Sequence, residues 1–149
     1  METEAHDGPH DQALDDALGA FWQESIYKAR LNHMPTYFGP TPLEVVRPPA
    51  WSVGESAAEA DRFVDGLLTE RVTAIAGSVT EYDDEEPRPE VGELGIVMGG
   101  DDRPRALVVV TEVHSSTYAA VGPETVVLSP GLEPDAELVV QRLRVLHSR

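Results

Sequence analysis

The residues best suited to chemistry lie between an early tryptophan and a late glutamate. Trp51 offers an aromatic face for stacking, and Arg71 could donate a fork of hydrogen bonds to a phosphate or carboxylate. Thr73 and Ser78 could add hydroxyls, and Glu112 a carboxylate. A simpler interpretation stays open, in which Arg71 pairs with a surface acid, Trp51 closes the end of a barrel and Thr73 is an ordinary strand residue.

The histidines are weaker candidates. His6 and His10 have a metal-ligand spacing, but their segment has almost no apolar residues to bury, which predicts a disordered acidic tail over residues 1–11. His114 and His147 have no Asp or Ser partner at the spacing of a catalytic motif. Neither pair therefore indicates a site.

The acidic and glycine-rich segments do not predict a ligand either. The acidic run at 83–86 lacks the spaced oxygen ligands and the glycine of a calcium loop. The glycines at 92, 95 and 99–100 are not followed by a helix, as a phosphate-binding loop requires. The chain also has no cysteine. We therefore expect no metal site and no cofactor.

The charge balance restricts the partners of the chain. Its 27 acidic residues outnumber 11 basic ones, giving a formal net charge of −16. Such a chain repels phosphate backbones and anionic lipids, so we expect no binding to duplex DNA or to a membrane. No apolar run approaches the ~20 residues that span a bilayer. With an acidic N-terminus and no cysteine, these features favour a soluble, cytoplasmic protein.

Two helices are expected in the N-terminal half. Apolar residues at helical spacing from Asp11, a plausible N-cap, predict a helix of about five turns. Ser56 and Glu59 have the spacing of a capping box, which predicts the start of a second helix over 57–69. Residues 34–49 contain five prolines, which predict a loop between the two helices.

The second half of the chain is rich in β-branched residues. They predict strands at 71–80, 94–98, 105–113 and 125–128. The turn residues at 99–104 predict an antiparallel hairpin, and 137–147 fits either a helix or a strand. The predicted fold is one α+β domain over residues 12–149, with a strongly curved sheet or a small barrel of five or so strands and two N-terminal helices packed on it.

Several short segments, in the right order, resemble the ASCH domain family of the PUA-like superfamily. The family pattern is Ala-Trp-x-Phe-Gly-Asp, a helix, Gly-x-Lys-x-x-Thr leading into a strand, and an acidic loop ending in Val-Gly-Asp. The corresponding segments are Ala50–Glu55, 57–69, Glu70–Ile75, Glu81–Tyr82 and Val91–Glu93, followed by Thr111–Val113 and a closing strand at Val139–Val145. The resemblance covers about residues 20–146 and implies a PUA-like fold.

The departures from this pattern bear on activity. The family's Gly is Glu70, its Lys is Val72 and its Thr is Ile75. In members that resemble acetylated-nucleoside amidohydrolases, the Lys, the Thr and a downstream Glu carry the reaction, and only Glu112 matches here. Apolar side chains cannot transfer protons, so we expect no useful hydrolysis of acetylated cytidine. The helical stretch before the family's last strand is replaced by a short turn at 130–135.

The resemblance implies a degenerate ASCH-type binding module for a nucleoside, a nucleotide or a short single-stranded RNA. Two alternatives stay open. One is a hydrolase that acts on a modified nucleoside or RNA with Glu112 as its catalytic residue. The other is a protein-interaction domain without a small-molecule ligand.

The expected ligand cleft lies where the Trp51 loop meets Glu112, with Arg71 or Thr73 nearby. The family pattern directs its Lys and its Thr, three residues apart, toward one cleft, which plain strand alternation forbids. A bulge or twist in the strand at 71–80 is therefore implied. It would turn the two matching residues, Val72 and Ile75, into the floor of the cleft.

Overall fold

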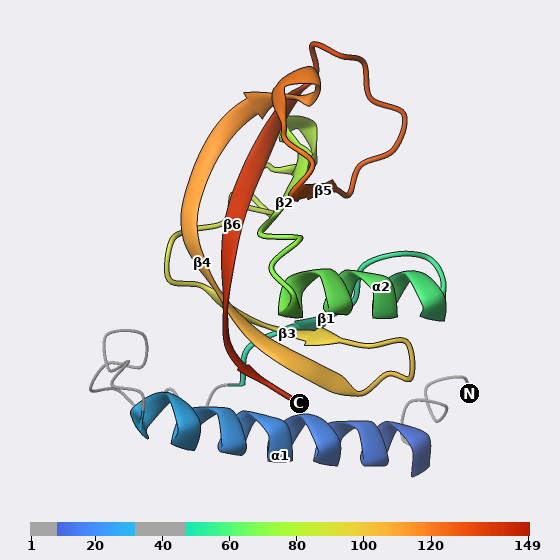
Figure 1. The fold of residues 1–149 in the computed structure, drawn as a ribbon, viewed down its shortest axis with the longest axis vertical. Helices are drawn as coiled ribbons and strands as arrows, with labels where there is room; N and C mark the ends of the chain where they lie inside the picture. Colours follow the sequence, from blue (N-terminus) through green and yellow to red (C-terminus); the bar gives the residue numbers. More distant parts are fainter. Residues whose placement is uncertain (1–8, 32–46) are drawn as a thin grey trace.

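A computed structural model describes residues 9–31 and 47–149, in which two helices pack on one six-stranded sheet (Figure 1). The strands are β1 (Ala50–Trp51), β2 (Ala74–Ser78), β3 (Leu94–Met98), β4 (Pro104–Thr117), β5 (Thr125–Val127) and β6 (Glu137–Ser148). Their order across the sheet is β1-β3-β4-β6-β2-β5. The sheet is curved but not closed, so the predicted α+β class is confirmed and the barrel alternative is wrong.

Strand pairing across the sheet shows the secondary structure of the segments that sequence periodicity left ambiguous. β6 pairs antiparallel with β4 from Ala106↔Ser148 to Thr117↔Glu137, so the ambiguous segment at 137–147 is a strand. β3 and β4 form the predicted antiparallel hairpin. The edge strands β1 and β5 pair in parallel with β3 and β2, and β1 was not predicted. Both edges are short.

Helix α1 (Pro9–Leu31) begins two residues before its predicted N-cap, so Asp11 lies inside the helix. A proline in the first turn costs no hydrogen bond, because the N–H groups there have no helical partner. The buried face of α1 packs on β3 and β4, as its helical spacing predicts. This cluster contains Leu18, Phe21, Trp22, Ile26, Ile96, Met98 and Leu107.

Two predictions fall mostly outside the described residues. The tail at 1–11 is described only from residue 9, where α1 starts, and the possible metal pair of His6 and His10 is not described at the side-chain level. The loop predicted at 34–49 is described only from residue 47. Both remain expectations.

Helix α2 (Ala57–Leu68) starts at the predicted capping box. The Ser56 hydroxyl accepts a hydrogen bond from the Glu59 amide at 3.1 Å, and the Glu59 carboxylate accepts one from the Glu55 amide at 2.7 Å. These bonds satisfy amide groups that the first helical turn cannot pair. The helix packs on the concave side of the long, curved strands β4 and β6 (Figure 1).

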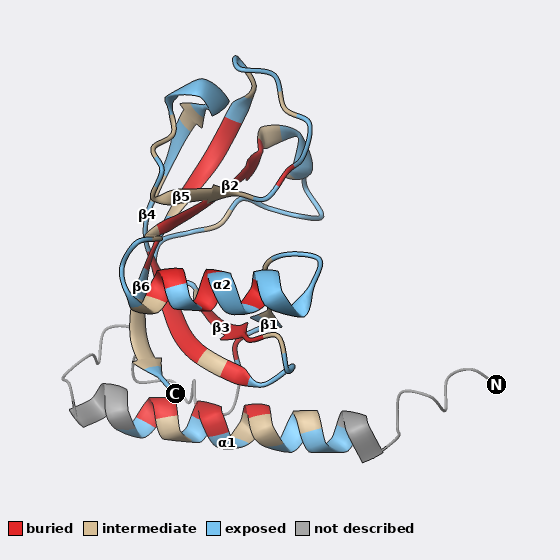
Figure 2. Cartoon of the chain, turned by 45° about the vertical axis from the view of Figure 1, so that its right-hand side comes forward, coloured by how far each residue is buried: buried red, intermediate tan, exposed pale blue. Residues whose placement is uncertain are grey.

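The hairpin of β3 and β4 is buried on both faces, because its residues alternate between two cores. Ile96 and Leu107 face α1, whereas Val97 and Val108 face α2. A third cluster, formed by Ala74, Ala76, Leu138 and Val140, lies farther along the sheet. Successive residues of β3, and of β4 as far as Val110, are therefore nearly all buried (Figure 2).

A β-bulge in β4 reverses which way its later residues face. The register with β6 shifts between Val110 and Glu112, so Thr111 is the extra residue. Val110 packs in the α2 core before the bulge, and Val113 packs there after it. Glu112 and His114 therefore face the opposite side of the sheet from α2.

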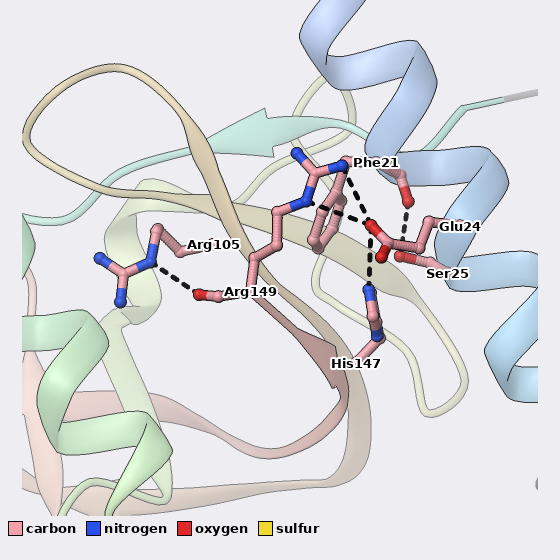
Figure 3. A network of polar contacts seen from close by, with 6 residues as sticks. All are labelled: Phe21, Glu24, Ser25, Arg105, His147 and Arg149. Carbon is pink, nitrogen blue, oxygen red and sulfur yellow. Dashed lines mark hydrogen bonds and ion pairs between the residues drawn. The ribbon is translucent and has the colours of Figure 1, made fainter.

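The end of β6 is joined to α1 by a polar network around Glu24 (Figure 3). Arg149 lies 3.0 Å from the Glu24 carboxylate and 5.6 Å from the centre of the Phe21 ring. His147 Nε2 lies 3.4 Å from the same carboxylate. Arg105 Nε donates to the carbonyl of Arg149 at 3.0 Å, which ties the strand end to β4.

This network predicts an acid-sensitive contribution to stability. Partial burial alone would raise the pKa of Glu24, but contact with His147 and the charge of Arg149 outweigh it and lower the pKa from its ordinary 4.5. A carboxyl whose pKa is lower in the folded state stabilises that state above pH 4.5, and the effect disappears as the pH falls through the folded-state pKa.

Glu24→Gln is expected to lower the free energy of unfolding at pH 7 by up to about 1 kcal/mol, because solvent screens a carboxylate that is 37% exposed. The gap between the wild type and the variant should shrink as the pH falls below 4.5 and through the lowered folded-state pKa of Glu24. Urea titrations at pH 7, 5 and 3.5 measure it. A gap at pH 3.5 as large as the gap at pH 5 would contradict the assignment.

Candidate functional site

A cleft of about 860 Å³ is lined by both edges of the open sheet. β1 with the segment after it forms one wall, and the end of β5 forms another. α2, the turn that follows it and Ile75 of β2 complete the lining. Its lining residues are Trp51–Glu55, Glu59, Arg62, Phe63, Gly66, Arg71, Val72, Ile75 and Val126–Leu128. Its volume lies within the roughly 300–1,000 Å³ of small-ligand sites.

Trp51 is held in the cleft wall by a glycine and a phenylalanine. A Cβ atom at Gly95 would lie 2.6 Å from Trp51 Nε1, so the indole approaches the β3 backbone at a distance only glycine permits. The Trp51 and Phe63 rings lie 6.3 Å apart at 52°. Trp51 is half-buried, and its remaining surface borders the cleft.

The apolar floor contains both residues that replace the family's Lys and Thr. Val72 and Ile75 line the cleft together, as the resemblance implies. The cause differs from the predicted bulge, because β2 begins only at Ala74 and its ladders have no register shift. Val72 instead lies in the turn after α2, where its amide donates to the Gly66 carbonyl at 3.0 Å.

The turn after α2 contains a residue in the left-handed conformation. Glu70 has a φ of 63°, and it occupies the position where the family pattern has glycine. A residue with a Cβ pays roughly 1–2 kcal/mol for this conformation, whereas glycine does not. A glycine at this position of the family pattern would therefore adopt the left-handed backbone conformation without strain.

Glu70→Gly is expected to raise the free energy of unfolding by about 0.5 to 1 kcal/mol, which is the relieved strain less the added entropy of the unfolded chain. Glu70→Ala is the matched control, because alanine keeps the strain and should gain little. Urea unfolding followed by circular dichroism measures both variants. A Glu70→Gly protein no more stable than Glu70→Ala would contradict this explanation.

Two arginines contribute the positive charge of the cleft. Arg62 comes from α2, and sequence reasoning missed it because nothing in its local pattern marks the helix face that meets the cleft. Arg71 comes from the following turn, where its Nε donates to the Thr69 hydroxyl at 3.2 Å. Two carboxylates, Glu55 and Glu59, line the cleft at the start of α2.

The remaining predicted residues lie elsewhere. The expected meeting of Trp51 and Glu112 is wrong, because the bulge in β4 turns Glu112 to the opposite side of the sheet. There the Glu112 carboxylate lies 3.5 Å from His114 and 3.8 Å from Arg142. Thr73 does not line the cleft either. Its amide donates to the Glu124 carbonyl, and its carbonyl accepts a hydrogen bond from the Leu143 amide.

Ser78 is also structural. It is buried at the end of β2, where its amide donates to the Ser129 hydroxyl at 3.0 Å. Among the described residues, no three acidic or histidine side chains are grouped so as to hold a metal ion. Within the same residues, no helix is both long enough and apolar enough to cross a membrane.

An open, curved sheet with α2 in its concavity and a cleft between its edges defines a PUA-like domain. A model of the ASCH domain matches residues 49–130, more than half of the chain, so the protein belongs to the ASCH domain family. The match contains β1, α2, the following turn and β5, which are the elements that build the cleft. The resemblance in sequence is thereby confirmed.

Two solved structures share the fold. Protein EF3133 from Enterococcus faecalis V583, of family DUF984, aligns with a TM-score of 0.67 and 21% identity over 90% of this chain and 95% of that one. An ASCH domain from Lactobacillus crispatus JV V101 aligns with a TM-score of 0.57 and 18% identity over 80% and 94%. No curated protein matches this chain.

Proposed function

We propose that this ASCH domain is a binding module that holds an unpaired nucleobase, carried by a nucleoside, a nucleotide or a short single-stranded RNA. The observation that carries the proposal is the position of Trp51. Its indole lines an open cleft and is braced by Gly95 and Phe63. A base that stacks on an aromatic side chain gains about 1–3 kcal/mol, whichever base it is.

The surroundings of Trp51 suit a base better than a sugar or a bare ion. The floor is apolar, with Val72, Ile75 and Val126 below the open space. A flat aromatic ligand can bury both of its faces in such a cleft, whereas a duplex cannot offer an unstacked base. The net charge of −16 also opposes long nucleic acids, which favours a short or single-nucleotide ligand.

The apolar residues on the floor of the cleft favour ligand binding over hydrolysis as its function. Val72 and Ile75 can neither donate nor accept a proton at the positions of the family's Lys and Thr. Glu112, the residue proposed for the hydrolase alternative, faces the other side of the sheet. Those three positions therefore do not form a catalytic group in this cleft.

Tryptophan fluorescence tests the proposal. The chain has only two tryptophans, and Trp22 is 3% exposed in the α1 core, so a ligand that quenches emission reports on Trp51. The probes are the four ribonucleosides, their 5′-monophosphates and a single-stranded RNA hexamer. We expect saturable quenching by at least one probe, together with a rise in melting temperature.

Trp51→Ala should remove ligand-induced thermal stabilisation, because the stacking face is lost. Tyr118→Ala is the control, since Tyr118 is a 41% exposed aromatic residue outside the cleft lining. Circular dichroism establishes that both variants are folded. Unchanged binding by Trp51→Ala would overturn the proposal, and so would a wild-type protein that binds none of the probes. Chromatographic detection of a reaction product would favour the hydrolase alternative instead.

A further inference from the structure

We propose that Arg62 and Arg71 form an anion subsite in the Trp51 cleft, so that the cleft selects a phosphorylated nucleotide over a neutral nucleoside. The inference rests on the proposed function and adds the class of ligand. Its starting point is the pairing of charges in a chain that has 27 acidic residues. Acids are abundant enough to pair with every arginine.

Four other arginines have acidic partners, whereas Arg88 and Arg105, which also have none within the described residues, lie outside the cleft lining. The described pairs are Arg47–Asp15 at 3.1 Å, Arg103–Asp101 at 3.7 Å, Arg142–Glu112 at 3.8 Å and Arg149–Glu24 at 3.0 Å. Within residues 47–149, neither Arg62 nor Arg71 is within 4.0 Å of a carboxylate oxygen, although both line the cleft. Two positive charges without acidic partners beside an aromatic wall are what an anionic aromatic ligand requires.

The fold orients Arg71 without neutralising it. Its Nε donates to the Thr69 hydroxyl at 3.2 Å, and that hydroxyl donates to the Asp65 carbonyl at 2.7 Å at the end of α2. The guanidinium is thus anchored through one nitrogen. Its two terminal nitrogens make no hydrogen bond in the described structure, so both remain for a ligand. A fork of this kind matches two oxygens of one phosphate.

The two carboxylates of the cleft form no ion pair with these arginines. Glu59 is engaged by the Glu55 amide at 2.7 Å as part of the helix cap. Both glutamates belong to the start of α2, whereas Arg62 lies farther along the helix and Arg71 follows its end. Glu59 lies one helical turn before Arg62, whereas Arg71 follows the end of the helix and is separated from both carboxylates by most of its length. We expect a nucleotide to place its phosphate at Arg71, with Arg62 on the same side of α2, while its base stacks on Trp51.

A comparison of matched ligands tests the subsite. Uridine and uridine 5′-monophosphate share the base and differ by the phosphate, and a uridine hexamer supplies phosphate from an RNA backbone. We expect at least one phosphorylated ligand to bind tenfold or more tightly than uridine at 50 mM salt. This advantage should shrink at 300 mM salt, because the phosphate contact is electrostatic.

Arg62→Met and Arg71→Met should each weaken the phosphorylated ligand by a larger factor than they weaken uridine, so that the advantage falls at least threefold. Arg88→Met is the control, because it removes the same charge from an exposed loop position outside the cleft lining. Arg71→Lys retains the charge but loses the fork, so we expect an intermediate advantage. Melting temperatures identify any variant that is weakened by misfolding.

The outcomes separate the two proposals. Equal binding of uridine and its phosphorylated forms would overturn the subsite and leave the stacking site intact. An advantage that persists in both methionine variants would also overturn it, because the phosphate would then bind elsewhere. If no uridine ligand bound while another base did, the same comparison would be made with that base. Failure of every nucleoside, nucleotide and RNA would defeat the proposed function itself.

Discussion

Phe21→Ala is expected to lower the free energy of unfolding by about 3 to 5 kcal/mol, the largest stability loss we expect from a single residue of α1. Phe21 is completely buried, and it packs between α1 and the hairpin of β3 and β4. Its ring also contacts His147, with ring centres 5.3 Å apart. Truncation would leave a cavity in the core that joins α1 to the sheet.

Tyr27→Ala is the matched control, because Tyr27 is an aromatic residue of the same helix that is 63% exposed. Its removal should cost less than about 0.5 kcal/mol. Urea unfolding followed by circular dichroism measures both variants, and hydrogen exchange shows whether β3 loses protection with α1. A loss below about 1 kcal/mol for Phe21→Ala would show that α1 contributes little to the core.

Gly95→Ala is expected to weaken ligand binding at least tenfold, because the new methyl group would lie 2.6 Å from Trp51 Nε1. The neighbouring atom belongs to a ring that Phe63 also confines, so the indole must move as a whole. Overpacking of this kind costs about 1–3 kcal/mol of stability. Quenching titrations measure the affinity, and urea unfolding measures the stability.

Gly19→Ala is the control for this substitution. No atom lies within 4 Å of a Cβ placed at Gly19, which is inside α1, so this change should stabilise the protein by about 0.5–1 kcal/mol. Its ligand affinity should equal that of the wild type. Retention of full affinity by Gly95→Ala would mean that ligand binding does not depend on the position of the Trp51 indole.

Local signals predicted the helices well. The start of α2 follows from Ser56 and Glu59, whose hydrogen bonds form within one turn and depend on no distant partner. The buried stripe of α1 likewise follows from its spacing. Residues 137–147 stayed ambiguous because periodicity carries no information about pairing, and the decisive contact is the long ladder with β4.

The composition of the site was predicted only in part. Trp51, Arg71, Val72 and Ile75 were placed together through the resemblance, and the structure brings them to one cleft. Glu112 was misplaced because one extra residue in β4 reverses the alternation, and nothing in the sequence around Thr111 marks a bulge.

The other walls of the cleft depend on strand order. Val126–Leu128 borders the cleft because β5 pairs in parallel with β2 at the edge of the sheet opposite β1. Such order is set by contacts between distant segments, which single-segment patterns do not encode. Arg62 was missed for the same reason, since its role depends on which element faces α2.

If Trp51 holds the base of the ligand, its indole N–H should report binding directly. The two tryptophans give two indole N–H signals in a proton–nitrogen NMR spectrum, which Trp51→Phe and Trp22→Phe assign. Titration with the tightest-binding nucleotide should shift the Trp51 signal in a saturable way and leave the signal of the buried Trp22 in place. Saturable binding that leaves the Trp51 signal unmoved, with shifts confined to the face of Glu112 and His114, would contradict the account.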